Sequence, residues 1–195
     1  MNLVQVKKIE MQEAILVSAF DQFSHKGYTA TTMSAIAKEA GTTVSNIYVY
    51  YPTKIFLLYA VYEPWLNKQL DIMRESVKRH RTPHAKLKYI FSYLWMDIVS
   101  ADHCFANTLI EALSSQAIGS KKQSNLLMLV EGTMSELLHE LLPETLWSSE
   151  RIHMLARLSW MAFDGFAINR RFEGENDISP LVEWVVDMLL GADKG

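Results

Sequence analysis

The sequence has little cysteine and no long apolar run. Its 195 residues contain one cysteine, Cys104, so no disulfide can form within the chain. A lone cysteine suits the reducing cytosol. No apolar run approaches the ~20 residues that a membrane-spanning helix needs. Acidic Glu10 and Glu13 follow the first two lysines closely, which argues against a signal-peptide core there. We therefore expect a cytoplasmic protein without a membrane partner.

The usual catalytic and metal-binding patterns are also missing. There is no glycine-rich phosphate loop, no His-Glu-x-x-His motif and no cysteine pair at metal-ligand spacing. His103 and Cys104 are adjacent, so on a helix they diverge by about a third of a turn and would not readily chelate one ion. We interpret them as a structural histidine and a buried thiol. The sequence predicts a protein that is not an enzyme and has no cofactor and no metal.

Charge is nearly balanced, so no strong basic field covers the chain. The formal net charge is -3 at pH 7. Residues 1–55 carry five lysines against four carboxylates, a local charge of +1, and residues 56–195 therefore carry -4. This modest polarity favours presenting the N-terminal end to phosphates.

Apolar residues recur at helical spacing along most of the chain. There is no alternating strand pattern and no internal repeat. At 49% hydrophobic residues, the chain can bury a substantial core. The pattern predicts an all-α fold. Outside the stretch treated next, we expect helices over 8–26, 54–78, 84–100, 105–118, 126–142, 153–172 and 181–190.

Residues 31–54 read as two short helices joined by a tight turn. Thr31 or Thr32 can cap the first helix, because a hydroxyl accepts hydrogen bonds from the free N–H groups at a helix start. Gly41 ends this helix, since a residue without a side chain turns sharply at no steric cost. The second helix, 45–50, is too short to stand alone and must be held by packing. This arrangement is a helix-turn-helix, whose second helix enters the DNA major groove.

The same region carries a family pattern over residues 9–58. The positions that match follow the family's spacing without gaps: residues 20–32, Ile36 and Ala37, Ala40 and Gly41, Ile47 and Tyr48, and residues 51–54. In these positions the chain resembles the N-terminal DNA-binding domain of TetR-type transcriptional regulators. The resemblance implies a three-helix DNA-binding domain followed by a larger helical domain for ligand binding and dimerisation, about nine helices in total.

The resemblance also implies which residues contact DNA. Tyr48 and Lys54 would contact phosphates. The start and outer face of the short second helix would read bases, because Asn pairs bidentately with adenine and Val or Thr methyls meet thymine. The predicted set is Thr32, Thr42, Thr43, Val44, Ser45, Asn46, Tyr48, Tyr50 and Lys54. Because a two-fold protein reads two-fold DNA, the operator should be an inverted repeat in double-stranded DNA.

The chain should divide into a DNA-binding domain, 1–55, and a ligand-binding and dimerisation domain, 56–195. Pro64 should kink the long helix that links them. In the last two helices, small side chains allow close helix approach, and the final helix has few residues to face water. In TetR-like proteins this pair forms a homodimer interface, although ordinary intrachain core is the alternative. The small residues are Ala156, Ser159, Ala162, Gly165 and Ala167.

Aromatic and sulfur side chains are abundant between the linking helix and the last two helices. Core packing is the default for each, but the resemblance implies a cavity for a small apolar or amphipathic effector. Asp97, Glu111 and Asp164 sit in apolar helices, and each must reach solvent, an arginine such as Arg157 or Arg170, or a ligand. The candidate ligand-binding residues are Trp95, Met96, Asp97, Phe105, Glu111, Met128, Trp160 and Phe163.

Together these patterns predict a ligand-responsive transcriptional regulator, most simply a repressor. The alternative is an all-helical protein-interaction module that has lost DNA binding, and the weak positive charge is the one feature that favours it. The hydroxyl and amide groups among the predicted DNA contacts, with Lys54 beyond them, argue against that alternative.

Overall fold

The computed structural model describes residues 3–101, 105–115, 126–174 and 177–191. Within these ranges every regular element is helical, which confirms the all-α prediction. The elements are α1 (Leu3–Ala30), α2 (Met33–Glu39), α3 (Val44–Tyr50), α4 (Lys54–Val77), α5 (Pro83–Ser92), the π-helix η1 (Tyr93–Asp97), α6 (Ile98–Ala101), α7 (Phe105–Ser114), α8 (Leu126–Leu141), α9 (Ser149–Glu173) and α10 (Ser179–Leu190). Because α5, η1 and α6 form one continuous helix, the described part contains nine helices, as expected.

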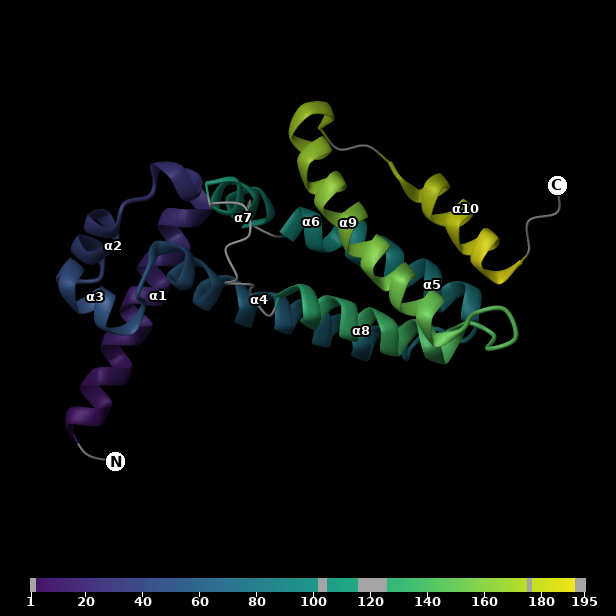
Figure 1. Ribbon diagram of the computed structural model, residues 1–195, viewed down its shortest axis with the longest axis horizontal. Coiled ribbons are helices and arrows are strands. Elements are labelled where there is room, and N and C mark those ends of the chain that lie inside the picture. Colours follow the sequence, from purple (N-terminus) through teal and green to yellow (C-terminus); the bar gives the residue numbers. More distant parts are fainter. Residues whose placement is uncertain (1–2, 102–104, 116–125, 175–176, 192–195) are drawn as a thin grey trace. The chain divides into compact units, whose positions relative to one another are not determined.

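Packing divides the chain into two compact units (Figure 1). Unit 1 contains α1, α2, α3, α7 and α4 up to Trp65, and unit 2 contains the rest of α4 with α5, η1, α6, α8, α9 and α10. The division falls inside α4, directly after Pro64 and Trp65. This grouping differs from 1–55 and 56–195 because α7 packs against α1. A functional boundary at residue 55 and a kink at Pro64 remain predictions.

In unit 1, α1 supplies one apolar face to the core. Ile15, Ala19 and Phe23 recur every fourth residue and are fully buried. The regular helix breaks at Gly27, where φ is 73° and ψ is -176°. That conformation is essentially confined to glycine, which confirms the expected helix end there. Beyond the break, Tyr28 folds back so that its ring stacks on Phe23 with centroids 6.2 Å apart.

Aromatic rings hold α7 within unit 1. The Phe105 side chain is fully buried, with its ring centroid 5.2 Å from Phe20 and 5.4 Å from Tyr62. Trp65 stacks on the same ring at 6.4 Å. Tilted or offset ring pairs at these separations stabilise a core beyond their buried area, by about 0.5–1.5 kcal/mol each. Phe105 is therefore a core residue of unit 1.

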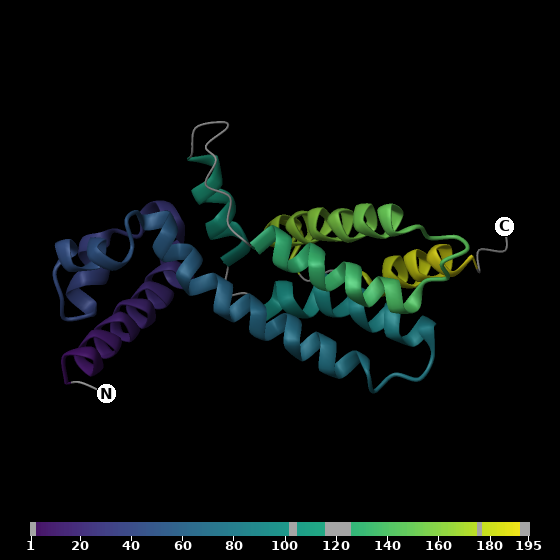
Figure 2. The same ribbon diagram turned by 60° about the horizontal axis from the view of Figure 1, so that its bottom comes forward.

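In unit 2, α8 packs against α9 (Figure 2). Val130, Met134 and Leu138 form the buried stripe of α8 at helical spacing. The second half of α4 is tied to α8 by Arg74, whose Nη2 donates to Thr133 Oγ1 at 2.8 Å. These contacts place α8 between α9 and the second half of α4.

The last helix, α10, packs against α5. Its inner face is Val182, Val186 and Leu189, which are buried. At the edge of this contact, Lys88 pairs with Glu183, and its hydrogen bond holds the pKa of the Glu183 carboxyl below its ordinary value. No helix in the described ranges is both long and apolar enough to cross a membrane.

Candidate nucleic-acid interface and effector cavity

The sequence builds α2 and α3 through their caps. Thr32 Oγ1 accepts a hydrogen bond from Ala35 N at 3.1 Å, and Thr43 Oγ1 accepts one from Asn46 N at 3.2 Å. Each bond satisfies an N–H group that the helix start leaves free. Between the helices Gly41 adopts φ 65°. The predicted first cap at Thr32 and the predicted turn at Gly41 are therefore confirmed.

Packing holds the two short helices, as their length requires. Met33, Ile36 and Ala37 of α2 are buried, and Ile47 is the fully buried residue of α3. A seven-residue helix is too short to persist alone in water, so α3 depends on Ile47 and on its cap. The buried side sets which residues α3 presents to solvent.

The outer side of α3 carries polar, aromatic and apolar groups. Thr43 and Ser45 are exposed, Tyr48 is 46% exposed and Val49 is 75% exposed. Val49 was not among the predicted contacts, although it presents more surface than Tyr48. The sequence does contain an indication of this exposure, because Val49 directly follows Tyr48 on the side of the short helix away from buried Ile47. This face carries hydroxyl groups and a methyl-bearing side chain, the kinds of group that can contact base edges in a major groove.

Asn46 and Tyr50 have partners within unit 1. Asn46 Nδ2 donates to Thr42 Oγ1 at 2.8 Å, so bidentate pairing with a base requires that this bond be exchanged. Lys8 Nζ lies 5.8 Å from the centroid of the Tyr50 ring, within cation–π range. Lys8 of α1 thus adds a positive charge beside α3. Thr42 and Val44 are half-buried, between the exposed positions.

Lys54 is held from inside unit 1. Its Nζ donates to the carbonyl oxygens of Tyr28 at 2.7 Å and Thr31 at 2.9 Å, and lies 4.1 Å from the Tyr28 ring centroid. Burial lowers the pKa of Lys54, and the nearby Glu111 carboxylate opposes that change. An ammonium group has three N–H donors, so one remains for a phosphate. The predicted phosphate contact stays a prediction, and Lys54 also anchors the segment before α2.

Unit 2 contains a cavity of about 250 Å³. One side is the π-helix η1 with the start of α6, and the other is the last part of α9 with Gly174 and Ile178. A π-helix is rare and often marks a functional site, because the extra residue in the turn re-aims the side chains. The cavity is lined by Trp95, Met96, Asp97, Val99, Ser100, Phe166, Asn169, Arg170, Gly174 and Ile178.

Trp95 is the fixed wall of this cavity. Its side chain is buried, and Nε1 donates to the carbonyl oxygen of Ser159 at 3.0 Å. Its ring meets Phe166 with centroids 5.4 Å apart. The polar part of the lining includes the Asp97 carboxyl, whose pKa is raised by desolvation, and the Arg170 guanidinium. The cavity thus combines aromatic walls with charged groups of both signs.

Three predicted ligand contacts meet at this cavity, namely Trp95, Met96 and Asp97. The other five do not line it. Phe105 and Glu111 belong to unit 1, where Glu111 Oε2 accepts a hydrogen bond from Thr29 N at 3.0 Å. Met128 is 67% exposed, and Trp160 stacks on Phe163 with ring centroids 4.7 Å apart. The Glu111 carboxylate thus accepts a hydrogen bond from the chain's own backbone instead of lining the cavity.

The exposed faces of α9 and α10 are apolar and bulky. Their exposed large side chains are Met154, Leu158, Met161 and Ile168 on α9, and Leu181, Trp184 and Met188 on α10. On each helix these residues recur at spacings of three, four or seven, which places them on one stripe. Of the five small residues expected to mediate close approach, Ala156, Ser159 and Ala167 are instead buried within unit 2.

Asp164 lies between Met161 and Ile168 on α9. Desolvation raises its pKa to about 6. The expected partner Arg157 pairs instead with Glu131, with Arg157 Nε 3.7 Å from Glu131 Oε1. Among the described residues no ion pair reaches Asp164. His103 and Cys104, interpreted above as structural, lie outside the described ranges.

Comparison with known proteins agrees with this geometry. Residues 15–61, which include α2 and α3, match the sequence model of the family described as bacterial regulatory proteins, tetR family. The chain is 35% identical over 99 residues to the HTH-type transcriptional regulator RutR of Escherichia coli (strain K12), which is 50% of this chain and 45% of RutR. It is 27% identical over 92 residues to the fatty acid metabolism regulator protein of Bacillus subtilis (strain 168), 47% of each chain.

The matched segment spans about half the length of these curated relatives. The whole fold is similar to that of the transcriptional regulator FadR from Bacillus subtilis, solved in complex with stearoyl-CoA. That comparison covers 91% of this chain and 97% of FadR, with a TM-score of 0.66 and 18% identity. The likeness therefore extends beyond the DNA-binding region at the level of the fold.

Proposed function

We propose that this chain, whose residues 15–61 match the tetR family of bacterial regulatory proteins, is a transcriptional repressor that binds an inverted-repeat operator as a homodimer. A small molecule in the cavity of unit 2 releases the operator. The observation that carries this proposal is the capped α2–α3 pair, with its apolar side buried and its polar side exposed. Curated relatives named as transcriptional regulators support it.

Operator binding uses the start and outer face of α3. Thr43, Ser45 and Asn46 lie at its N-terminus, where side chains of a recognition helix reach base edges. Tyr48 offers its hydroxyl to a phosphate, and Thr32 lies at the start of α2, the helix that crosses the backbone. Lys8 adds an attraction that does not depend on base sequence.

Dimerisation uses the apolar stripes of α9 and α10. Leu158, Met161 and Trp184 are each more than half exposed, and burying such side chains against a second copy removes their apolar surface from water. A two-fold dimer presents two α3 helices to two half-sites. Half-sites one helical turn apart, ~34 Å, then form an inverted repeat.

The effector is a compact amphipathic molecule. A volume of about 250 Å³ lies below the ~300–1,000 Å³ of cavities for drug-sized ligands, so a small ring system fits better than a long chain. Trp95 and Phe166 would stack on its apolar part, and Asp97 and Asn169 would accept hydrogen bonds from its polar part. A cationic group suits the Asp97 carboxylate.

Release of DNA requires the effector to prefer the conformation that does not bind the operator. DNA must then weaken effector binding by the same factor, because the coupling is reciprocal. The change passes along α4, which belongs to both units and contains Pro64. Trp95 reports occupancy directly. Effector binding should change tryptophan fluorescence in the wild type and do so much less in Trp95→Phe.

A salt titration distinguishes the regulator from the protein-interaction module. DNA binding through phosphates falls linearly on a log–log plot, with a slope of about -0.9 per phosphate contact. We expect such a slope for a random duplex, and weaker binding to all sequences in Tyr48→Phe. Tyr89→Phe, on α5 in unit 2, is the matched control and should bind as the wild type does. Absence of duplex binding at low salt by the folded protein would favour the interaction module.

A further inference from the structure

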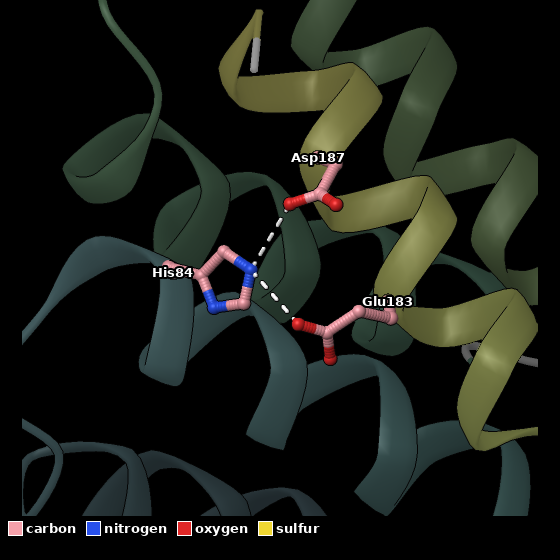
Figure 3. A group of neighbouring side chains, drawn as sticks. All are labelled: His84, Glu183 and Asp187. Atoms are coloured by element: carbon pink, nitrogen blue, oxygen red, sulfur yellow. Dashed lines mark hydrogen bonds and ion pairs between the residues drawn. The ribbon is translucent and has the colours of Figure 1, made fainter. Parts of the chain in front are cut away.

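Three side chains from two helices of unit 2 converge on one point (Figure 3). His84 lies in the first turn of α5, and Glu183 and Asp187 lie one turn apart on α10. His84 Nε2 is 3.2 Å from Glu183 Oε1 and 3.1 Å from Asp187 Oδ1. The three ligand atoms all lie within 4.8 Å of one another.

Hydrogen bonding alone leaves this arrangement incomplete. Both carboxylates face the same ring nitrogen, and that nitrogen carries at most one hydrogen. This nitrogen can therefore donate a well-formed hydrogen bond to only one of the two carboxylates, and the other receives none from it. A cation at the same point would satisfy the nitrogen lone pair and both carboxylates together.

The two distances from His84 Nε2 suit a small divalent ion, and the Glu183 and Asp187 oxygens lie within 4.8 Å of each other. Ligand atoms ~2.0–2.2 Å from an ion, at tetrahedral or octahedral angles, lie roughly 2.8–3.6 Å from one another. Both nitrogen-to-oxygen distances, 3.2 Å to Glu183 and 3.1 Å to Asp187, fall in that range. The three side chains are between 38% and 43% exposed, so an ion can enter from solvent.

Lys88 fixes the Glu183 carboxylate without occupying the same oxygen. Its Nζ pairs with Glu183 Oε2, whereas His84 faces Oε1. By pairing with Oε2, Lys88 orients the Glu183 carboxylate so that Oε1 faces the proposed ion. Hydrogen bonds from neighbouring groups orient metal ligands in the same way. Lys88 lies one turn beyond His84 on α5, so the same helix face supplies the ligand and its support.

We propose that His84, Glu183 and Asp187 bind a divalent first-row transition-metal ion, with Zn²⁺ the best match. One imidazole and two carboxylates are ligands that Zn²⁺ accepts, and three protein ligands leave a position for water. The ion joins α5 to α10, and α10 also carries exposed Trp184 and Met188. Binding would therefore stiffen a helix of the proposed dimer face. The site itself does not depend on the proposed operator binding.

The experiment is calorimetric titration of ZnCl₂ into the untagged, chelator-treated protein, with thermal unfolding on the same samples. We expect one saturable site per chain and a higher unfolding midpoint with Zn²⁺. His84→Ala and Glu183→Gln should each weaken binding tenfold or more and remove the shift in midpoint. His25→Ala is the matched control, because His25 also pairs with a carboxylate, Asp21, outside the cluster.

Two results would overturn the proposal. One is the absence of saturable binding to the wild type. The other is equal affinity in the wild type, His84→Ala and Glu183→Gln, since Zn²⁺ would then bind elsewhere. The second variant keeps the shape of the carboxylate, so it still reports if His84→Ala disturbs the start of α5. Visible absorption of Co²⁺ bound in place of Zn²⁺ reports ligation directly, and loss of that spectrum in Glu183→Gln supports the assignment.

Discussion

The ammonium nitrogen of Lys54 lies 2.7 Å from the carbonyl oxygen of Tyr28. Lys54 is the first residue of α4, and Tyr28 follows the break in α1 at Gly27. A second bond, to Thr31 O, makes Lys54 a link between α4 and the segment that leads into α2. A residue placed by resemblance on a phosphate thus also holds the helix-turn-helix in position.

Lys54→Met should therefore lower stability as well as DNA affinity. Loss of two charge-assisted hydrogen bonds at a partly exposed site should reduce the free energy of unfolding by about 1 kcal/mol, measured by urea unfolding. Lys38→Met, at an exposed position of α2, should change it by less than about 0.5 kcal/mol. If Lys54 also contacts a phosphate, the salt slope of DNA binding falls by about 1. Unchanged stability in Lys54→Met would refute the anchoring role.

Gly27→Ala should be destabilising. The backbone there has φ 73° and ψ -176°, and an added Cβ would lie 3.1 Å from Glu111 Oε1. We expect a loss of about 1–3 kcal/mol in the free energy of unfolding. Gly132→Ala is the matched control. It lies within α8 with nothing near an added Cβ, so it should stabilise by about 0.5–1 kcal/mol. Equal effects of the two substitutions would contradict this account of Gly27.

Asp164→Asn should stabilise the protein at neutral pH. The folded protein keeps the Asp164 proton up to about pH 6, whereas the unfolded chain releases it near the ordinary carboxyl pKa of 3.8. The folded state therefore binds more protons between these values, and stability falls as pH rises through that window. Because the side chain is partly exposed, we expect a gain of about 1 kcal/mol for Asp164→Asn at pH 7.5.

That gain should shrink toward pH 4, where the Asp164 carboxyl is protonated in the folded state and becomes partly protonated in the unfolded chain as well. Urea unfolding at both pH values tests the difference. A loss of stability in Asp164→Asn at pH 7.5 would show that the carboxylate has a favourable partner in the assembled protein.

Leu158→Glu should weaken self-association. Leu158 is 60% exposed and lies on the apolar stripe of α9, so a carboxylate there would be buried against a second copy. Sedimentation should show a dimer for the wild type and more monomer for the variant. Glu140→Lys changes an exposed residue of α8, away from the stripes of α9 and α10, and should leave the dimer intact. A monomeric wild type would refute the proposed interface.

Local patterns explain what could be predicted. The cap at Thr32, the turn at Gly41 and the buried faces of α2 and α3 follow from hydroxyl, glycine and apolar spacing within a few residues. The exposed stripe on α10 follows from the same periodicity. These elements depend on contacts between residues that are close in the chain, so the local residue pattern is enough to predict them.

Features built from distant segments could not be predicted. Phe105 and Glu111 belong to unit 1 because α7 packs on α1, and no local pattern records that pairing. His84 and Asp187 meet across 103 positions, so their spacing matches no metal motif. The π-helix at Tyr93–Asp97 also has no periodic signal, although it places Trp95 and Asp97 on the cavity.

Asn46→Ala should relax sequence preference at one base pair of each half-site. Asn46 lies at the start of α3, and an amide that pairs with adenine contributes roughly 1–3 kcal/mol of discrimination. Selection of duplexes by the wild type and the variant measures that position. Lys38→Ala, at an exposed position of α2 outside the predicted contacts, should leave the preferred base unchanged. Identical preferences in the wild type and Asn46→Ala would exclude Asn46 as a base reader.

In the proposed homodimer, paired α3 helices read a two-fold DNA site. Selection from random duplexes with the wild-type protein, followed by sequencing of the bound fraction, tests it most directly. We expect enrichment of an inverted repeat whose half-sites lie about one helical turn, ~34 Å, or a multiple of it apart. If the folded protein enriches no sequence, or enriches a single half-site without symmetry, the proposed operator binding by a homodimer is wrong.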